Sequence, residues 1–426
     1  MEDPVVSVGG GESLPEGWEC TRLGLVVEPR HESVQPRNAA HLPYVGLEHI
    51  EPGNSRIHQF GQPDDVRSAK SRFYPGDVLY GKLRPYLDKA ALAESDGICS
   101  TDILVLVPCG DIDPSFASYL LHSTPFIEHA VATTTGVNHP RTSWNALQQL
   151  VIYLPPLSEQ RAIAHALSTI QSAIGAADKV ITAIYALKQS TLRHLLTYGL
   201  VQVQDSATVL LKDSNVGPIP QQWSVVTLGE VSKIGNGSTP KRDEPRYWDG
   251  GTIPWLTSGK VHEGTITSAD ELVTEAAYAE CHLPLVPKRS IVVAITGQGK
   301  TLGNAALLAL DTCISQHLAY ITLHDNKLQP EFVLYFLQSR YMQLQAVGRS
   351  GGSTKAALTC GYLKGYSIPC PPIVEQRAIV QTLYAIDRKI ETESQRKSAL
   401  QALFKSALQR LMTGTIRVGA ESTQAD

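Results

Sequence analysis

A stretch of ten residues occurs twice in this chain, and the repetition constrains the fold more than any other feature. Residues 154–163 read LPPLSEQRAI, and residues 370–379 read CPPIVEQRAI. A shift of 216 positions aligns residues 114–163 with residues 330–379 without a gap, and 17 of these 50 positions are identical. Roughly three identities would be expected by chance at average composition. The chain is therefore a tandem duplication, which predicts two like units.

The repeated stretch stands where a globular segment ends and a helical segment begins. A double proline ends the globular segment. A glutamate follows in the first turn of the helix, where the helix dipole favours a negative charge. We interpret the repeated residues as a cap and a domain–helix junction rather than a ligand site. They are Pro155, Pro156, Glu159, Gln160, Arg161, Pro371, Pro372, Glu375, Gln376 and Arg377.

Each copy opens a long helical pattern with the spacing of a coiled-coil seam. In the first helix the apolar positions follow spacings of four and three without interruption: Ile163, Leu167, Ile170, Ile174, Ala177, Ile181 and Ile184. The second seam begins Ile379, Leu383, Ile386, Ile390, is interrupted at Glu393 and Lys397, and resumes with Leu400, Leu403, Ala407 and Leu411. We expect Glu393 and Lys397 to face solvent or a partner subunit.

The segments before the long helices have the patterns of mixed α/β domains. Residues 41–52, 71–92 and 97–108 predict strands, and 115–131 predicts a helix that the second repeat matches at 331–347. Each repeat begins with a tryptophan, Trp18 or Trp223, which we expect in the core.

The expected fold class is α+β: two globular α/β domains joined by a pair of long antiparallel coiled-coil helices, in a pseudo-two-fold tandem repeat. Seven segments follow from the patterns. They are 1–13 (disordered), 14–156 (first domain), 157–201 (first helix), 202–218 (linker), 219–372 (second domain), 373–418 (second helix) and 419–426 (disordered tail).

Composition excludes several classes of protein. No apolar run approaches 18 residues, so we expect a cytoplasmic protein without a membrane partner. The seven cysteines have no metal-ligand spacing, which predicts reduced thiols and no metal site. The net charge of −4 gives no support for nucleic-acid binding, and residues 1–156 alone carry 11 basic and 19 acidic side chains, or −8. An acidic domain can still present one basic face.

The sequence ITGQGKTLG at 295–303 resembles half of a phosphate-binding loop. The required first glycine is replaced by Ala294, and the segment is expected between two strands rather than before a helix. A basic, glycine-rich loop presented to a nucleic-acid backbone is the better interpretation. No HExxH motif, nucleophile elbow or paired-carboxylate cleft is evident, so we predict no catalytic residue.

Taken together, the motifs resemble those of a known family. They are PP(L/I)xEQRAI before each long helix, LRHLLTYG at 192–199 and LQRLMTG at 408–414 at the helix ends, YGKLRPYLDKAAL at 80–92, GICSTD at 97–102 and TPKRDEPRYWDGGTIPWLTSG at 239–259. From Leu14 to about Val418 the chain is similar to the specificity subunits of type I restriction-modification enzymes.

The resemblance implies a non-catalytic subunit with two target-recognition domains that read the two halves of a split, asymmetric site in double-stranded DNA. The helices would fix the spacing and dock two methyltransferase subunits, and motor-nuclease restriction subunits would join for cleavage. No cofactor is expected in this subunit: S-adenosylmethionine would belong to the methyltransferase, and ATP and Mg²⁺ to the motor-nuclease.

Loop position and charge give the candidate DNA contacts, because Arg and Lys bind phosphates and guanine edges while polar side chains read bases. The candidates are Lys82, Arg84, Asn138, Arg141, Lys241, Arg242, Arg246, Tyr247, Trp248, Lys260, Lys300, Ser353, Thr354 and Lys355. Two alternatives remain open: a coiled-coil adaptor without DNA readout and, less favoured, a nucleotide-binding enzyme that uses Gly299–Thr301.

Overall fold

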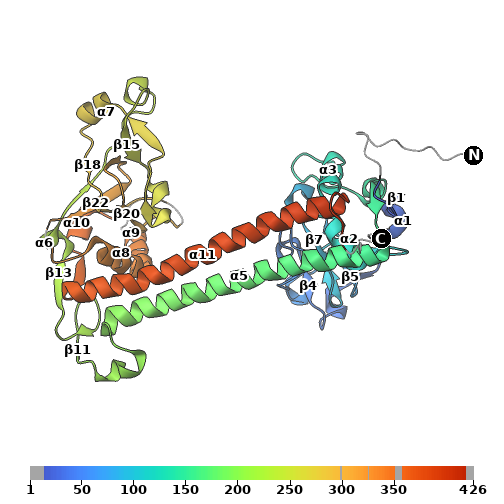
Figure 1. Ribbon diagram of the computed structural model, residues 1–426, viewed down its shortest axis with the longest axis horizontal. Coiled ribbons are helices and arrows are strands. Elements are labelled where there is room, and N and C mark those ends of the chain that lie inside the picture. The colour runs from blue at the N-terminus through green and yellow to red at the C-terminus, as the bar shows by residue number, and fades with distance from the viewer. Residues whose placement is uncertain (1–13, 298–299, 325, 351–356, 419–426) are drawn as a thin grey trace, which may run out of the picture. The chain divides into compact units, whose positions relative to one another are not determined.

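A computed structural model of the 426-residue chain describes residues 14–297, 300–324, 326–350 and 357–418 (Figure 1). It forms two compact units: unit 1 comprises residues 1–179 and 394–426, and unit 2 comprises residues 180–393. The boundary between the two units falls within each of the two long helices. The predicted division into recognition domains, helices and linker remains a prediction, and its outer segments 1–13 and 419–426 lie outside the described residues.

Unit 1 contains two four-stranded sheets. The first has the order β2 (Val27–Pro29), β9 (Ile103–Pro108), β6 (Val78–Gly81) and β7 (Ala90–Leu92), with all neighbours antiparallel. The second has the order β3 (Ser33–Val34), β5 (Lys70–Phe73), β8 (Gly97–Cys99) and β4 (Tyr44–Val45), in which β4 runs parallel to β8.

Unit 2 also contains two sheets, of five and four strands. Its first sheet has the order β14 (Ser232–Asn236), β22 (Leu318–Leu323), β19 (Ile291–Ala294), β20 (Ala305–Leu308) and β16 (Thr265–Ile266). Its second has the order β17 (Glu271–Val273), β15 (Ile253–Leu256), β21 (Thr312–Ile314) and β18 (Leu285–Val286), and β15 runs parallel to β21 as β4 does to β8. The duplication in sequence thus repeats the first sheet and three strands of the second, whereas the fourth strand lies beside β5 in unit 1 (β3) and beside β15 in unit 2 (β17).

Short helices and two-stranded ribbons complete the units. Unit 1 has α1 (Leu23–Val26), α2 (Pro114–Leu120), α3 (Thr124–Ala132), α4 (Trp144–Leu147) and the ribbon of β1 (Glu19–Arg22) with β10 (Val151–Leu154). Unit 2 has α6 (Leu228–Val231), α7 (Glu275–Glu280), α8 (Pro330–Ser339), α9 (Tyr341–Ser350), α10 (Cys360–Lys364), the ribbon of β13 (Ser224–Thr227) with β23 (Ser367–Cys370), and that of β11 (Leu211–Lys212) with β12 (Ile219–Pro220).

Three sequence predictions of elements were too simple. The strand predicted over 97–108 is divided into β8 and β9 by a turn in which the Ile103 N–H donates to the Ser100 carbonyl at 2.9 Å. Of 41–52 only Tyr44–Val45 forms a strand, and a 3-10 helix (Leu47–His49) follows. The helix predicted over 115–131 is two helices, because Pro125 has no N–H to continue the first and suits the opening turn of α3.

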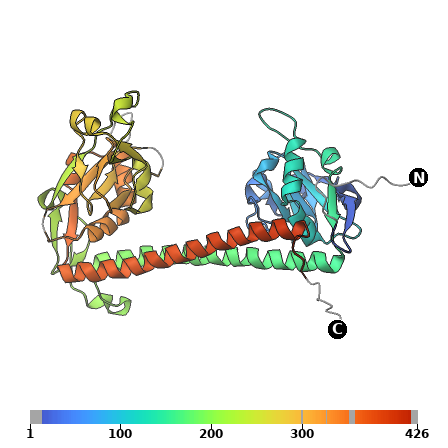
Figure 2. The same ribbon diagram turned by 45° about the horizontal axis from the view of Figure 1, so that its top comes forward.

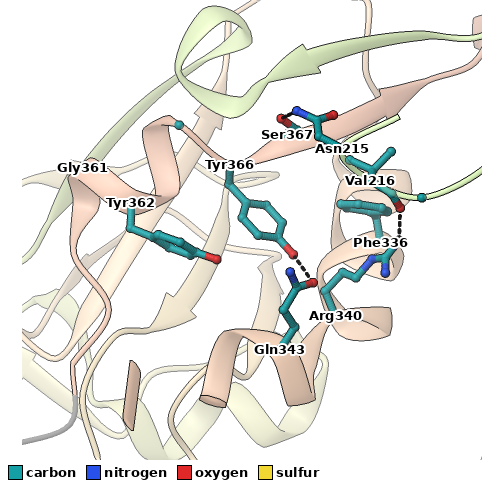
Figure 3. A pocket seen from close by; sticks show the side chains of 11 residues that line it. Asn215, Val216, Phe336, Arg340, Gln343, Gly361, Tyr362, Tyr366 and Ser367 are labelled. Atoms are coloured by element: carbon teal, nitrogen blue, oxygen red, sulfur yellow. Dashed lines mark hydrogen bonds between the residues drawn. The ribbon is translucent and has the colours of Figure 1, made fainter. Parts of the chain in front are cut away.

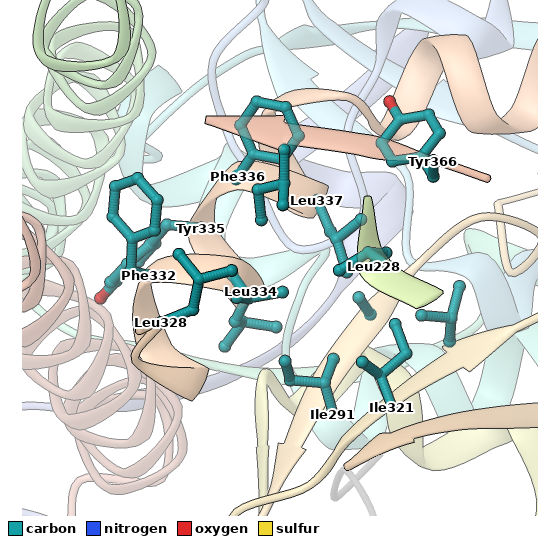
Figure 4. Packing of buried hydrophobic residues seen from close by; sticks show 14 of the residues in the cluster. Leu228, Ile291, Ile321, Leu328, Phe332, Leu334, Tyr335, Phe336, Leu337 and Tyr366 are labelled. Carbon is teal, nitrogen blue, oxygen red and sulfur yellow. The ribbon is translucent and has the colours of Figure 1, made fainter. Parts of the chain in front are cut away.

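One large buried cluster of unit 2 lies between its first sheet and α8 (Figure 4). Phe332 and Phe336 of α8 are fully buried and pack in one cluster with Ile291 and Ile321 of the sheet. Apolar residues at helical spacing thus cover apolar residues of the strands. Trp223 joins the same cluster, and Trp18 is buried in the corresponding cluster of unit 1, as predicted.

The long helices are α5 (Leu157–Tyr198, 42 residues) and α11 (Ile373–Met412, 40 residues). Within each unit, their stretches lie side by side in both views (Figure 1 and Figure 2). In unit 1, Asp178 bonds to Lys397, and Ile163 packs in one cluster with Leu411. In unit 2, Lys188 bonds to Asp387, and Leu195 packs in one cluster with Ile379. The helices therefore run antiparallel within each unit.

The seam of α11 differs from its prediction. Leu403 is 52% exposed and Phe404 takes its place in the buried face. The spacings from Ile390 to Phe404 are then 3, 4, 3 and 4, through Glu393, Lys397 and Leu400, so the seam is not interrupted.

The prediction that Glu393 and Lys397 face solvent or a partner subunit is wrong. Glu393 is 6% exposed and accepts a hydrogen bond from Lys389 at 2.7 Å. Lys397 is half-buried and donates to Asp178 of α5 at 2.5 Å. Sequence periodicity assigned both charges to the outside because it does not show that Lys389 of the same helix pairs with Glu393, or that Asp178 of α5 pairs with Lys397.

One buried glutamine joins the start of each long helix to the globular segment before it. Gln160 accepts from the Asp113 N–H and donates to the Asp111 and Pro155 carbonyls, each at 2.8 Å. Gln376 accepts from the Gln329 N–H at 2.9 Å and donates to the Lys327 and Pro371 carbonyls at 2.7 and 2.9 Å. Both side chains are fully buried, so their amides have exchanged water for these partners.

The adjacent glutamates bind the tryptophans that open each repeat. The Trp18 indole N–H donates to Glu159 at 3.1 Å, and that of Trp223 donates to Glu375 at 2.9 Å. Arg417, just beyond α11, adds a bidentate pair to Glu159 at 2.7 and 3.0 Å. The junction residues thus connect the beginning of each repeat to its helix. Of the residues described, none belongs to a helix long and apolar enough to cross a membrane.

We predict that Gln160→Ala and Gln376→Ala each lower the free energy of unfolding by about 1–3 kcal/mol, because each leaves buried backbone groups without partners. Chemical denaturation measures the loss. Arg161→Ala is the matched control, since the Arg161 side chain is 69% exposed, and a change of at most about 0.5 kcal/mol is expected. Equal effects of the glutamine and arginine variants would contradict this role.

Candidate nucleic-acid interface

In unit 1 two of the predicted loops meet at the end of strand β6 in the first sheet, which we call the loop edge. Lys82 follows β6 directly, and its N–H donates to the Asp102 carbonyl at 3.0 Å. The Thr142 N–H donates to the Lys82 carbonyl at 3.1 Å, and the Arg84 N–H donates to the Pro140 carbonyl at 2.8 Å. The structure therefore brings the Lys82–Arg84 and Asn138–Arg141 segments together, although more than 50 residues separate them in sequence.

Unit 2 has the same backbone frame at the corresponding edge. The residue after β19 is Ile295, whose N–H donates to the His317 carbonyl at 3.0 Å. The Leu358 N–H donates to the Ile295 carbonyl at 2.7 Å, as Thr142 does to Lys82. An isolated bridge pairs Leu83 with Arg141 in unit 1, and another pairs Thr296 with Ala357 in unit 2. Three main-chain interactions of this edge are thus repeated in unit 2.

The side chains on this shared frame differ between the units. The residue after the strand is Lys82 in unit 1 and Ile295 in unit 2. The residue before β9 is Asp102, whereas the residue before β22 is His317. Arg141 stands where unit 2 has Ala357. Two equivalent edges therefore offer different hydrogen-bonding groups to whatever binds them.

Asp102 is the centre of the charged cluster in unit 1. The Arg141 guanidinium donates to both of its carboxylate oxygens, at 2.8 and 3.3 Å. These hydrogen bonds hold the pKa of the Asp102 carboxyl below its ordinary value, and the charges of Lys82 and His139 act in the same direction. Arg141 is therefore oriented, and Lys82 is held near the same carboxylate.

Arg84 differs from Arg141 in its surroundings. It is exposed, its backbone is left-handed with φ of 54°, and it precedes the 3-10 helix Pro85–Leu87. Among the described residues Arg84 makes no ion pair. Asn138 is exposed in the neighbouring loop. A left-handed conformation at a non-glycine residue costs free energy, and such positions cluster at binding sites.

The predicted segment Lys241–Trp248 lies against α7 and β17 in unit 2. Arg242 pairs with Glu271 and lies over the Trp248 ring, with 4.2 Å from guanidinium to centroid. Arg246 pairs with Glu280 at 2.8 Å. Unit 2 thus supplies carboxylates to both arginines, which reduces the positive charge available for a phosphate.

The aromatic residues of this segment also have internal partners. Tyr247 is buried, and its hydroxyl donates to Glu280 at 2.9 Å; this hydrogen bond to the carboxylate raises the pKa of the Tyr247 phenol. The Trp248 indole donates to the Lys241 carbonyl at 2.9 Å, and its ring meets Trp255 edge-on at 5.3 Å. Lys241 itself is exposed.

Lys260 and Lys300 lie on segments that touch. Lys260 belongs to the 3-10 helix Ser258–Glu263 and pairs with Glu263 at 2.8 Å and Asp270 at 3.2 Å. His262 of the same helix lies 3.3 Å from the Thr301 hydroxyl and 3.0 Å from the Asn304 amide. Lys300 is exposed, and its carbonyl accepts from the Tyr341 hydroxyl at 2.9 Å. Ser353, Thr354 and Lys355 lie outside the described residues.

The segment 295–304 joins two antiparallel strands, β19 and β20, as the sequence predicted. No helix begins at its described residues, so it lacks the helix N-terminus on which a phosphate-binding loop depends. In the described part of the chain, no group of three or more His, Cys, Asp or Glu side chains is arranged to hold a metal ion.

Sequence reasoning missed four polar residues at these edges: Asp102, His262, Gln316 and His317. Gln316 and His317 are exposed in the turn before β22, and His317 lies 2.6 Å from the Thr296 hydroxyl. The signal was present, since GICSTD and TCISQH align at the same turn. Charge was the criterion for selecting candidates, however, and it passes over a neutral glutamine and histidine.

Unit 2 also has a cavity of about 450 Å³ beside α8 and α10 (Figure 3). Several of its polar side chains bond to one another or to nearby backbone. Arg340 donates to the Val216 carbonyl, Tyr366 to Gln343 at 3.3 Å, and Asn215 to Ser367 at 2.7 Å. None of the predicted DNA contacts lines this cavity, and its bonds connect the segment before β12 to α8 and β23.

Comparison with known proteins decides the family. The model of the type I restriction modification DNA specificity domain matches residues 15–184 and again residues 220–402. The chain belongs to the family of type I restriction-modification specificity subunits. Each match covers one repeat, from its opening tryptophan region into its long helix.

Relatives of this specificity subunit extend over nearly its whole length. A putative type I restriction enzyme MjaX specificity subunit from Methanocaldococcus jannaschii is 28% identical over 420 residues, which are 95% of each chain. The EcoR124I/EcoR124II specificity subunit of Escherichia coli is 27% identical over 168 residues, covering 39% of this chain and 41% of its own.

Solved structures share the fold of this specificity subunit. A chain from a structure concerning complex assembly and conformational transition of the type I R-M system has a TM-score of 0.61 at 22% identity and covers 95% of this chain and 100% of its own. The type I restriction-modification S subunit from M. genitalium has a TM-score of 0.58 at 17% identity, covering 94% and 98%. At these identities the likeness concerns the fold alone.

We predict a pH-dependent contribution from the Asp102–Arg141 pair. The folded pKa of Asp102 lies below its ordinary value, so the pair stabilises unit 1 above about pH 4, and this contribution is lost as pH falls through the lowered pKa. The difference in melting temperature between the wild type and Asp102→Asn should therefore be larger at about pH 6 than at about pH 3. Asp64→Asn, at an exposed carboxylate, is the control. A difference independent of pH would refute the assignment.

Proposed function

We propose that this specificity subunit reads a bipartite, asymmetric site in double-stranded DNA, one half with the loop edge of each unit. The observation that carries the proposal is the repeated backbone frame with different side chains. Direct readout requires a fixed main chain that places variable donors and acceptors against base edges. Lys82, Arg84 and Arg141 supply donors in unit 1, and Gln316 and His317 supply mixed groups in unit 2.

These residues differ in whether a carboxylate already pairs with them, and this supports different roles in DNA binding. Arg84 is exposed and makes no ion pair among the described residues, so it suits a phosphate or a guanine edge. Arg141 is oriented by Asp102, which suits a base contact that needs fixed geometry. Arg242, Arg246 and Lys260 are paired with carboxylates of unit 2, so we assign them a smaller share of DNA affinity than the sequence suggested.

We predict that Arg84→Ala and Arg141→Ala alter recognition of one half-site only, the half read by unit 1. Loss of a good side-chain contact to a base costs about 1–3 kcal/mol of discrimination. The measurement is single-molecule methylation mapping of DNA from cells that express each variant with its methyltransferase partner. Arg22→Ala, on the β1–β10 ribbon, is the exposed control. An unchanged motif in both arginine variants would favour an adaptor without DNA readout.

We further propose that α5 and α11, each of which runs through both units, set the spacing of the half-sites and dock two methyltransferase subunits. An exposed face repeated in both helices supports two like partners. Ala183, Ala186, Leu187 and Ser190 of α5 are exposed and lie at positions i, i+3, i+4 and i+7 of one helix face. The residues 216 positions later, Ala399, Ala402, Leu403 and Ser406, are identical and also exposed.

Such a face suits a helix of the partner, because small residues allow two helices to approach closely and a leucine supplies apolar area. Leu187 is 56% exposed and Leu403 is 52% exposed, so both leucines present apolar area at equivalent positions. The chemistry of methylation and cleavage would reside in the partners: S-adenosylmethionine in the methyltransferase, and ATP with Mg²⁺ in the motor-nuclease restriction subunits.

We predict that Leu187→Glu and Leu403→Glu each reduce the number of bound methyltransferase subunits from two to one, and that the double variant binds none. A charge buried against an apolar partner surface without a counter-charge opposes association. Native mass spectrometry of the purified complex counts the subunits. Gln189→Glu and Lys405→Glu, exposed neighbours outside the face, are the controls. Two subunits bound to the double variant would exclude this face.

A further inference from the structure

The loop of unit 1 that carries Arg84 is bounded by two residues with a left-handed backbone. Arg84 has a φ of 54° and Asp88 has a φ of 51°, and the 3-10 helix Pro85–Leu87 lies between them. The Leu87 N–H donates to the Arg84 carbonyl at 2.9 Å, and the Asp88 N–H donates to the Pro85 carbonyl at 3.0 Å. The place of Arg84 at the loop edge therefore depends on a short turn with an unfavourable backbone conformation at both ends.

Asp88 has a side-chain partner that offsets the cost of this conformation. Its carboxylate lies 2.6 Å from Nδ1 of His122, which is in the turn between α2 and α3 and whose side chain is fully buried. An ionised carboxylate only accepts hydrogen bonds, so Nδ1 carries the proton and donates it. Helices α2 and α3 pack in one cluster with β6 and β7. The bond thus ties the end of the 3-10 helix to a well-packed part of unit 1.

The second ring nitrogen of His122 is left without a hydrogen bond. Nε2 is buried and has no partner in the part of the chain that the structure describes, so Asp88 is the one group there that bonds to the imidazole. A buried nitrogen without a partner costs free energy, and an apolar side chain would avoid that cost. What a histidine adds at this position is the bond to Asp88.

The main chain of Asp88 is also held, from the side of the long helix. Its carbonyl accepts from the Gly53 N–H at 2.9 Å, and the Gly53 carbonyl accepts from the Gln171 side chain of α5 at 3.3 Å. Asp88 is therefore fixed through both its backbone and its carboxylate. Arg84 is exposed and, among the described residues, makes no ion pair, so the turn is what orients it.

Unit 2 has different residues at the two equivalent positions. Counted back from the paired strands β7 and β20, Gly303 corresponds to Asp88, and Gln338 stands 216 positions after His122. Gly303 is also left-handed, with a φ of 83°, which a glycine adopts without steric cost. The main-chain interactions shared by the two loop edges therefore form in unit 2 without a carboxylate–imidazole bond. In unit 1 this bond serves the loop and the side chains that the loop presents.

We propose that Asp88 and His122 are positioning residues for DNA reading by unit 1. Their hydrogen bond holds residues 84–88 in the conformation that presents the Arg84 guanidinium to the half-site. This role rests on the proposed function, and the buried His122 acts through Arg84 rather than by touching DNA. A contact to a base edge needs fixed geometry, which an exposed arginine without an ion pair obtains from its backbone.

The test uses the full-length specificity subunit expressed with its methyltransferase partner. Asp88→Gly removes the carboxylate and leaves a residue that takes the left-handed backbone freely, as Gly303 does. Methylation at sites with one changed base in the half read by Arg84 should rise about tenfold relative to correct sites, because the arginine no longer discriminates. Discrimination in the other half should stay the same. Asp64→Gly, at an exposed residue of another 3-10 helix, is the control.

Two further variants separate the hydrogen bond from packing. His122→Leu fills the buried space without a donor, and Asp88→Asn keeps an acceptor in a residue that tolerates the left-handed backbone. His122→Leu should lose discrimination as Asp88→Gly does, while Asp88→Asn should keep it. Amide hydrogen exchange of residues 84–89 should rise about tenfold in His122→Leu and stay at the wild-type rate in Asp88→Asn. A purely structural bond predicts a lower melting temperature with unchanged discrimination.

Arg84→Ala supplies the decisive comparison, since it also identifies the half-site concerned. If the bond acts through Arg84, adding Asp88→Gly to Arg84→Ala changes discrimination no further, whereas independent effects add. Additive effects would overturn the positioning role. Wild-type discrimination in Asp88→Gly and His122→Leu, with altered discrimination in Arg84→Ala, would overturn it and leave the proposed function in place. An unchanged motif in every variant, Arg84→Ala included, would contradict DNA reading at this loop edge and the positioning role with it.

Discussion

A buried glutamine at the start of each long helix is the contact on which the rest of the arrangement depends. Gln160 and Gln376 each satisfy one backbone N–H and two carbonyls that no strand or helix would otherwise pair. Because an unsatisfied buried amide is costly, the helix can begin in one orientation only relative to the strand before it. The neighbouring glutamate then ties the opening tryptophan of the repeat to the same turn, so both ends of each globular segment meet at one point.

Much of the fold could be predicted from sequence because each motif and each apolar pattern of the repeat occurs in two copies. The long helices and the buried tryptophans were evident from the repeat and its apolar spacing. The errors were local: Pro125 divides a helix, and a turn at Ser100 divides a strand. Phe404 rather than Leu403 enters the seam because the spacing allowed either residue, and only packing against Tyr119 distinguishes them.

The candidate site was less predictable. Lys82, Arg84, Asn138 and Arg141 are brought together by main-chain bonds between distant segments, which no local pattern shows. Arg242 and Arg246 were selected for their charge, but Glu271 and Glu280 neutralise them from elsewhere in the sequence. Charge counting cannot separate an arginine that is available to a ligand from one already engaged.

The repeated loop frame has a consequence for how such a protein can change over time. Its geometry is held by bonds from backbone N–H groups to carbonyls, at Lys82 and Ile295 alike, and these bonds are indifferent to side-chain identity. Substitutions at these positions therefore alter what the surface presents while the chain still folds. New recognition could be acquired in single mutational steps, each of them viable, in one unit without disturbing the other.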